Sequence, residues 1–172
     1  MPSIEIVEYD PAWPDLFEKE KARILSVAGA YIDDIQHVGS TAVPGLGAKP
    51  TIDMLIEQAE LSLVEKCVQP LQTLGYEYLG ENGLPNRHFF RKPIGASWTG
   101  RLFNLHVVEK GSDEWRRMLV FRDYLRLYPE DAQQYYLLKK ELADTYDADY
   151  EGYTNAKTSF IEGILVKASL AE

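Results

Sequence analysis

The sequence is poor in cysteine, with Cys67 alone among 172 residues. One cysteine excludes an internal disulfide and any zinc cluster built from thiolates, and it fits a reducing compartment. Long apolar runs are also missing, since none approaches the roughly 20 residues that a helix needs to cross a bilayer. Residues 1–10 are too short and too charged for the apolar part of a signal peptide. We therefore expect a cytoplasmic protein with no membrane partner.

Basic residues are scarce relative to acidic ones. The chain has 18 Lys and Arg against 27 Asp and Glu, which gives a net charge of -9. Because this field repels the phosphate backbone, binding to nucleic acid is disfavoured. The hydrophobic fraction of 45% is typical of a globular protein, and the length suits one core. With no linker, repeat or low-complexity tract, we expect a single domain over residues 1–172.

Hydrophobic spacing predicts a mixed αβ part over residues 1–110 and a helical part over residues 111–172, packed on it. Strands are expected at residues 3–9, 32–38, 51–56, 76–79, 87–92 and 101–109. Helices are expected at residues 10–29, 61–74, 112–128, 129–146 and 155–168. Four arginines at helical spacing are expected on a solvated helix face, namely Arg116, Arg117, Arg122 and Arg126.

The most informative stretch is residues 37–53, HVGSTAVPGLGAKPTID, which joins two predicted strands. Its glycines allow backbone N–H groups to approach phosphate oxygens, and Ser40 adds a hydroxyl donor. Lys49 adds positive charge, and Asp53 could hold Mg²⁺. This combination can serve phosphate chemistry.

Two better-known loops do not fit this stretch. A P-loop requires adjacent Gly-Lys entering a helix, whereas Ala48 separates Gly47 from Lys49 and Pro50 bars a regular helix there. A nucleophile elbow requires Gly-x-Ser-x-Gly, which is not the spacing around the Gly-Ser pair of this loop. The sequence therefore argues against both a P-loop enzyme and a serine hydrolase.

Two windows of the acidic chain contain no Asp or Glu, residues 35–52 and 82–108. The first contains Lys49, and the second contains Arg87, Arg91, Lys92 and Arg101. If the windows meet in the fold, they form one cationic surface for a phosphate-bearing ligand. Alternatively, the arginines pair with acidic helices of the C-terminal third. Trp98, in the second window, either stacks on a base or covers the edge of the core.

Four separated runs occur in a recognisable order: HVGSTAVPGLGAKPTIDMLI, NRHFFRK, NLHVVEKGSDEWRRMLVFRDYLR and YTNAKTSFIEGIL. Together they resemble the GrpB family over nearly the whole chain, from Ile4 to Leu165. The resemblance implies an α+β nucleotidyltransferase-like fold, with a mixed β-sheet, flanking helices and a C-terminal helical third. Members of this family occur alone or as a domain attached to dephospho-CoA kinase, and the family as a whole has no assigned reaction.

The resemblance also implies which residues matter. Nucleotidyltransferases grip a triphosphate with Gly-Ser and hold two metal ions with an Asp-x-Asp pair and a third acid. Gly39 and Ser40 match the first motif, and Asp53 matches the first acid. Leu55 stands at the second acid position, and no carboxylate precedes Glu109 on its predicted strand.

Two substitutes for the missing acids can be named. Glu57 lies on the same strand face as Asp53, and His106 could act as a ligand that favours Mn²⁺, Fe²⁺ or Zn²⁺. The alternatives without metal binding are that Glu57 is an exposed acid and that His106 is a structural, hydrogen-bonded histidine.

Three functions follow as hypotheses. The first is a divalent-metal-dependent nucleotidyltransferase, using Mg²⁺ or Mn²⁺ to act on a nucleoside triphosphate and an unknown acceptor. Its expected catalytic residues are Asp53 and Ser40, its phosphate-binding residues Gly39, Ser40, Thr41, Lys49, Arg87 and Arg91, and its metal ligands Asp53 and His106. The second, favoured by Leu55, is a module that binds a nucleotide or phosphorylated small molecule without turnover. The third is an interaction domain whose helical third docks a protein partner.

Overall fold

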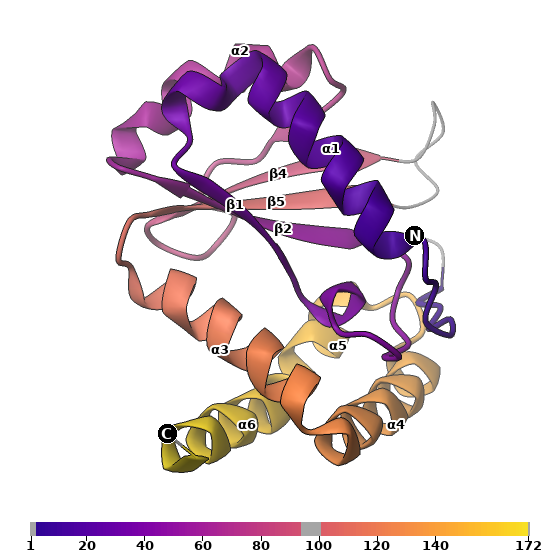
Figure 1. The fold of residues 1–172 in the computed structure, drawn as a ribbon. Helices are drawn as coiled ribbons and strands as arrows, with labels where there is room; N and C mark the ends of the chain where they lie inside the picture. The colour runs from indigo at the N-terminus through magenta and orange to yellow at the C-terminus, as the bar shows by residue number, and fades with distance from the viewer. Residues whose placement is uncertain (1–2, 94–100, 172) are drawn as a thin grey trace.

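The computed structural model describes residues 3–93 and 101–171, with the side chains of residues 101, 102 and 171 excepted. Its centre is a five-stranded sheet with the strand order β1-β2-β5-β4-β3 (Figure 1). Strands β2 and β5 are parallel, and the other neighbours are antiparallel. The strands are β1 (Asp34–Val38), β2 (Ile52–Gln58), β3 (Glu77–Tyr78), β4 (Arg87–Pro93) and β5 (Arg101–Glu109).

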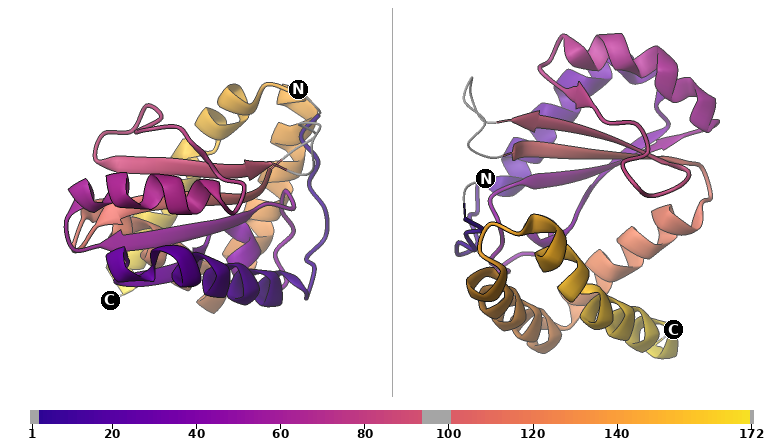
Figure 2. Two further views of the ribbon diagram at one scale, coloured as in Figure 1. Left: turned by 90° about the horizontal axis from the view of Figure 1, so that it is seen from above. Right: turned by 180° about the vertical axis from the view of Figure 1, so that it is seen from behind.

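Helices lie on both sides of this sheet, as the views in Figures 1 and 2 show. On one face lie α1 (Trp13–Ala28) and α2 (Val64–Gln72). On the side of the other face lie α3 (Asp113–Leu127), α4 (Pro129–Tyr146), α5 (Tyr150–Ala156) and α6 (Thr158–Ala171). Short 3₁₀ turns are η1 (Gly29–Tyr31), η2 (Ser40–Ala42) and η3 (Leu61–Leu63). A helix with the length and apolar character to cross a bilayer is not found in the described ranges.

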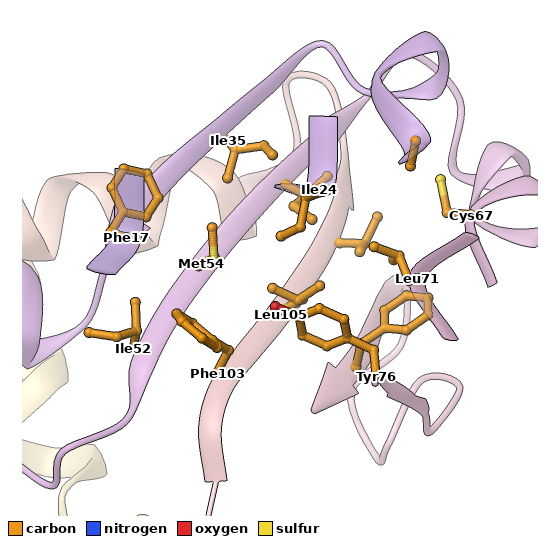
Figure 3. Packing of buried hydrophobic residues seen from close by; sticks show 14 of the residues in the cluster. Phe17, Ile24, Ile35, Ile52, Met54, Cys67, Leu71, Tyr76, Phe103 and Leu105 are labelled. Atoms are coloured by element: carbon orange, nitrogen blue, oxygen red, sulfur yellow. The ribbon is translucent and has the colours of Figure 1, made fainter. Parts of the chain in front are cut away.

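Alternation along β2 assigns its side chains to the two faces of the sheet. Ile52, Met54 and Ile56 pack with Phe103 and Leu105 of β5 in the main core (Figure 3). This core also takes in apolar side chains of α1 and α2, among them Phe17, Ile24, Cys67 and Leu71. Asp53, Leu55 and Glu57 lie on the opposite face of the sheet. That face is turned towards the helical third.

The packing of α1 on β4 includes one buried acid. Glu20 is 1% exposed, and its carboxylate accepts a hydrogen bond from the Tyr76 hydroxyl at 2.5 Å. Lys92 lies 3.2 Å from the same oxygen, and Arg23 lies 3.4 Å from the other one. Because the carboxylate is both paired and hydrogen-bonded, its burial is tolerated, and it ties α1 to the sheet.

The N-terminal segment differs from the expectation of a strand over residues 3–9. It forms one isolated bridge, between Val7 and Ala48, and no named strand. The Ile4 N–H donates to the carbonyl oxygen of Asp147, and the Ile4 side chain is buried beside Tyr153. The apolar residues of this segment are buried against the loop before β2 and against the helical third instead of in the sheet. The prediction of a strand was therefore wrong.

The last predicted helix also differs, because residues 150–171 form two helices, α5 and α6, with Lys157 between them. The side chain of Asp149 accepts a hydrogen bond from the Gly152 N–H and so caps a helix that starts earlier than expected. Hydrophobic spacing does not detect a single-residue break, which explains why one helix was predicted.

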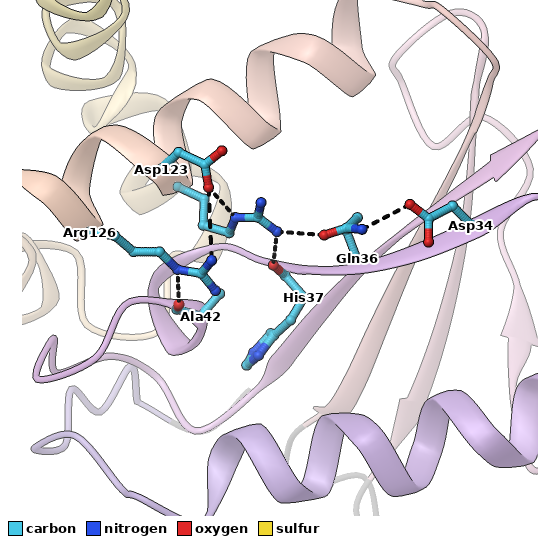
Figure 4. A network of polar contacts seen from close by, with 7 residues as sticks. Asp34, Gln36, His37, Ala42, Asp123 and Arg126 are labelled. Atoms are coloured by element: carbon cyan, nitrogen blue, oxygen red, sulfur yellow. Dashed lines mark hydrogen bonds and ion pairs between the residues drawn. The ribbon is translucent and has the colours of Figure 1, made fainter.

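Arg122 was expected on a solvated face, and this was wrong. It is 9% exposed, and its guanidinium reaches from α3 to the strand β1. Its Nη1 donates to the side chain of Gln36 and to the carbonyl oxygen of His37, at 2.9 and 3.0 Å (Figure 4). Its Nε donates to Asp123 at 2.8 Å. The arginine therefore ties the helical third to the edge of the sheet.

Candidate functional site

The Gly-Ser turn and Asp53 lie directly against each other. Val38, the last residue of β1, pairs with Asp53 of β2, and Gly39 follows with φ at +74°. A Cβ atom on Gly39 would lie 2.9 Å from Asp53 Oδ2 and 3.3 Å from its Cβ. Any side chain there would meet both a strained backbone and a steric conflict. Glycine is therefore what allows Ser40 and Asp53 to share one site.

Asp53 is held by two residues of β5. Asn104 Nδ2 donates to Asp53 Oδ1 at 3.2 Å, and His106 Nε2 lies 3.2 Å from the same oxygen. The side chain keeps 30% of its surface exposed. Burial acts to raise the pKa of Asp53, but hydrogen bonds from His106 and Asn104 and the charge of Lys49 outweigh it, so the pKa lies below its ordinary value. Asp53 is therefore ionised at neutral pH.

Three lysines from separate parts of the chain lie near one another, and two of them, Lys49 and Lys157, interact electrostatically with Asp53. We call Lys49, Lys139, Lys157, Ser40 and Asp53 together the lysine site. Lys49 comes from the loop before β2, Lys139 from α4 and Lys157 from the turn between α5 and α6. The ammonium groups of Lys49 and Lys157 lie 5.0 and 4.4 Å from the centre of the Tyr153 ring. The helical third thus brings two cations to the loop that the sequence singled out.

Burial and mutual repulsion act on these amines. Burial, together with the charges of Lys157 and Lys49, lowers the pKa of Lys139 to about 7. Burial and the charge of Lys49 lower the pKa of Lys157 to about 8, with Asp53 acting in the opposite direction. Lys139 is 2% exposed, and its Nζ donates to the carbonyl oxygen of Gly47 at 2.5 Å. The site therefore holds amines whose charged forms are disfavoured by their surroundings.

Two tyrosines line the same place. The Tyr135 hydroxyl shares a hydrogen bond with Ser40, and the Tyr135 ring lies 4.8 Å from Lys139 Nζ. Tyr153 is fully buried, and its hydroxyl finds no hydrogen-bond partner among the described residues. A buried hydroxyl without a partner is uncommon, since such a group loses its bonds to water. Both hydroxyls are neutral, because burial raises the pKa of each tyrosine.

The two windows without acidic residues do meet, because Asp53 next to the first window contacts Asn104 and His106 of the second. The arginines of the second window have other contacts in the described structure. Arg91 Nε lies 2.9 Å from Glu77 Oε2, and Arg87 Nη1 lies 3.3 Å from His106 Nδ1. The side chain of Arg101, and Trp98 altogether, lie outside the described residues.

Of the predicted phosphate-binding residues, Ser40 and Lys49 belong to the lysine site, and Gly39 comes directly before Ser40 in the chain. Thr41 is 2% exposed, and its hydroxyl is 2.8 Å from His37 Nε2. Sequence reasoning missed Lys139 and Lys157. The available signal for Lys139 was its position four residues after Tyr135, on the buried face of the predicted helix.

A two-metal centre does not fit these residues. Leu55, at the second acid position, is fully buried and packs with Val38, Val108 and the side chains of α3. Asn104 and His106 of β5 lie beside Asp53 and Leu55, where a nucleotidyltransferase would have its third acid. Glu57 lies four residues along β2 from Asp53, about 13 Å away at the usual rise of a strand. The described residues contain no group of three or more His, Cys, Asp or Glu able to hold a metal ion.

Comparison with known proteins identifies relatives over most of the chain. The family model described as GrpB protein matches residues 3–167. The UPF0157 protein YqkA of Bacillus subtilis is 37% identical over 159 residues, which are 92% of this chain and 45% of YqkA. A UPF0157 protein of Pseudomonas aeruginosa is 40% identical over 168 residues, 98% of this chain and 69% of that protein. This chain therefore spans less than half of YqkA.

Part of a dephospho-CoA kinase matches as well. The enzyme of Mycolicibacterium paratuberculosis is 27% identical over 175 aligned residues, covering 90% of this chain and 43% of the kinase. This agrees with the expectation that related domains occur attached to dephospho-CoA kinase.

Solved structures confirm the expected fold. The crystal structure of conserved protein GrpB from Enterococcus faecalis matches with a TM-score of 0.86 and 35% identity, over 95% of this chain and 96% of that one. A Cid1 poly(U) polymerase structure bound to MgATP matches with a TM-score of 0.54 over 81% of this chain and 44% of that one. Its identity of 11% shows the fold alone. The prediction of a nucleotidyltransferase-like α+β fold is thus confirmed.

Proposed function

Because this chain belongs to the GrpB family and has a nucleotidyltransferase-like fold, we propose that its lysine site binds the phosphate groups of a nucleotide or phosphorylated metabolite. The observation that carries this proposal is the convergence of Lys49, Lys139 and Lys157 on one place beside Ser40. Three chain segments supply them, although the protein as a whole is acidic, with a net charge of -9.

The electrostatics of the site favour an anion of several charges. Gathering three amines costs desolvation and repulsion, and the lowered pKa values of Lys139 and Lys157 reflect that cost. A polyphosphate brings opposite charge to all three, and it restores the charged form of each amine. The hydroxyl of Ser40 adds a donor, and the turn at Gly39 lets backbone approach a phosphate oxygen. The lysines supply this attraction without a metal ion.

The binding proposal is tested by calorimetric titration with inorganic triphosphate, ATP, AMP and adenosine, each in EDTA and in Mg²⁺. We expect affinity to rise with the number of phosphates and to persist in EDTA. Lys157→Met should weaken ATP binding by about 10-fold, which corresponds to about 1.4 kcal/mol. Lys140→Met, next to Lys139 but exposed, is the matched control and should leave affinity unchanged. No binding by any phosphate compound, or equal binding by Lys157→Met, would contradict the proposal.

A second candidate is nucleotidyl transfer to an unknown acceptor, with Mg²⁺ or Mn²⁺ as the expected cofactor. It is favoured by the contact of ionised Asp53 with the Gly-Ser turn, the pair of motifs that this chemistry uses. The buried Leu55 weighs against it, because leucine supplies no ligand to a metal ion. We therefore place binding first and transfer second.

Asp53→Asn separates these two candidates. We expect this variant to fold and to bind ATP in EDTA within about 3-fold of the parent, because the lysines carry that binding and the loss is well below 1.4 kcal/mol. The measurement pairs calorimetry with an assay for pyrophosphate released from nucleoside triphosphates in Mg²⁺ or Mn²⁺, with candidate acceptors present. Release by the parent that disappears in Asp53→Asn would establish transfer. Loss of ATP binding in EDTA would show instead that Asp53 belongs to the binding determinant.

A further inference from the structure

His106 lies between Asp53 and Arg87, and each of its ring nitrogens has one of them as its partner. Its Nε2 is 3.2 Å from Asp53 Oδ1, and its Nδ1 is 3.3 Å from Arg87 Nη1. The ring is 13% exposed and rests 5.3 Å from the centre of the Phe89 ring. The three polar residues come from three neighbouring strands, β2, β5 and β4.

These contacts determine where the imidazole proton is. A guanidinium group only donates hydrogen bonds, so Nδ1 of His106 must be the acceptor for Arg87. The proton of the neutral ring is then on Nε2, which donates to Asp53 Oδ1. Asn104 donates to the same oxygen, so Oδ1 receives two donors. Two directed hydrogen bonds fix the plane of the carboxylate, which one bond would leave able to rotate.

Arg87 is itself anchored. Its Nη2 donates to the carbonyl oxygens of Glu81 and Asn82, each at 3.4 Å. Its guanidinium carbon lies 5.3 Å from the centre of the Phe89 ring. The turn that supplies the two carbonyls has positive φ angles at Gly80, Asn82, Gly83 and Asn86. The position of Arg87, and through it the acceptor role of His106 Nδ1, therefore depends on the shape of this turn.

We propose that Arg87 and His106 are positioning residues that set the direction of the Asp53 carboxylate. In this arrangement His106 Nε2 carries a proton, so it is not a metal ligand, and Arg87 acts through His106 on Asp53 instead of on a phosphate. The inference rests on the proposed function only in that Asp53 belongs to the lysine site. The arrangement itself is a property of the ligand-free protein.

The test is long-range ¹H–¹⁵N NMR of the ligand-free protein at pH 8, which distinguishes the two imidazole tautomers. The chain has three histidines, and His106→Gln identifies the His106 signals by their loss. We expect one tautomer for His106, protonated at Nε2. Arg87→Met removes the donor to Nδ1 and should give a mixture of tautomers, while Arg87→Lys, which keeps a donor, should restore the single form. Arg91→Met, on the same face of β4, is the matched control and should have no effect.

A His106 ring protonated at Nδ1 in the parent would overturn the proposal, and so would an unchanged tautomer in Arg87→Met. If Arg87→Met does not fold, the parent and Arg87→Lys spectra still decide, because the parent tautomer alone can contradict the arrangement. A protein that shows the expected tautomer but binds no phosphate compound would refute the proposed function and leave this inference standing.

Discussion

If the proposed site binds phosphate, ATP in EDTA is expected to bind on the order of 100-fold more tightly at pH 7 than at pH 9, because two amines of that site lose their protons between these values. The pKa is about 7 for Lys139 and about 8 for Lys157. At pH 9 both amines are mostly neutral, so the binding of an anion must be accompanied by protonation of the amines, which weakens binding. A terminal phosphate whose second pKa is near 6 changes its charge little over this range. The pH dependence therefore comes from the protein.

Calorimetry in two buffers that differ in ionisation enthalpy measures the protons taken up. We expect an uptake of about one to two protons per ATP at pH 8.5, from the fractions of Lys139 and Lys157 that are neutral there. Lys157→Met should reduce this uptake, and Lys140→Met should not. Affinity that is constant from pH 7 to pH 9, or binding without proton uptake, would show that neither amine faces the ligand.

The same lysines give the ligand-free protein the opposite trend. An amine whose pKa is lower in the folded state binds fewer protons there than in the unfolded chain, between its folded pKa and its ordinary value of 10.5. Within that window their contribution to the free energy of unfolding rises with pH. Bound ATP should reduce this rise, since it returns the folded-state pKa values towards the ordinary one. The melting temperature, followed with and without ATP from pH 7 to pH 9, reports both trends.

Gly47→Ala is expected to cost about 3 kcal/mol of unfolding free energy, at the upper end of the usual penalty for overpacking. A Cβ atom on Gly47 would collide with the ring of Tyr136, and it would lie 2.6 Å from the carbonyl oxygen of Val7. One of these atoms is backbone, so rotation of a side chain cannot relieve both contacts. The loop must then move away from α4, and the hydrogen bond from Lys139 to Gly47 is lost or lengthened. Urea denaturation measures the cost, and ATP titration should show weaker binding in the fraction that remains folded.

Two other glycines provide controls for Gly47→Ala. Gly45, two residues earlier, has φ at +82° and no atom within 4 Å of an added Cβ, so Gly45→Ala tests backbone strain without a collision. Gly163→Ala, in open space on α6, should be neutral or stabilise by about 0.5–1 kcal/mol through helix propensity. If Gly47→Ala were no more costly than Gly45→Ala, the close packing of loop and helix would be refuted.

The strands and most helices could be predicted from local patterns, because each presents a regular apolar face to a core. The strand at residues 101–109 has the predicted bounds, and Ser112 caps α3 as expected, with its hydroxyl accepting from the Trp115 N–H. The N-terminal segment and the break at Lys157 were missed because they depend on contacts with distant parts of the chain. A local pattern contains no information about those partners.

The residues of the candidate site also fall into those that local patterns predict and those that depend on distant contacts. Gly39 and Asp53 could be predicted to share one site because one strand ends just before Gly39 and the next begins just before Asp53. Lys157 could not, because a lysine inside a site differs from a surface lysine only in its tertiary surroundings, and the one signal for Lys139 was its helical spacing from Tyr135. Arg87 was assigned to phosphate from its charge alone, whereas the structure shows its guanidinium against His106. Charge patterns thus predicted that residues 35–52 and 82–108 meet, without giving the partner of each side chain.

The contact of Arg122 with β1 bears on how copies of this protein behave at high concentration. β1 has a neighbouring strand on one side only, and an open strand edge invites pairing with a strand from another molecule. Arg122 occupies the His37 carbonyl from α3, and Arg126 does the same for the Ala42 carbonyl just beyond the strand (Figure 4). At the other end of the sheet, β3 is two residues long and offers little to pair with. The helical third therefore hinders the pairing of β1 with a strand of another molecule, which favours solubility of the folded chain.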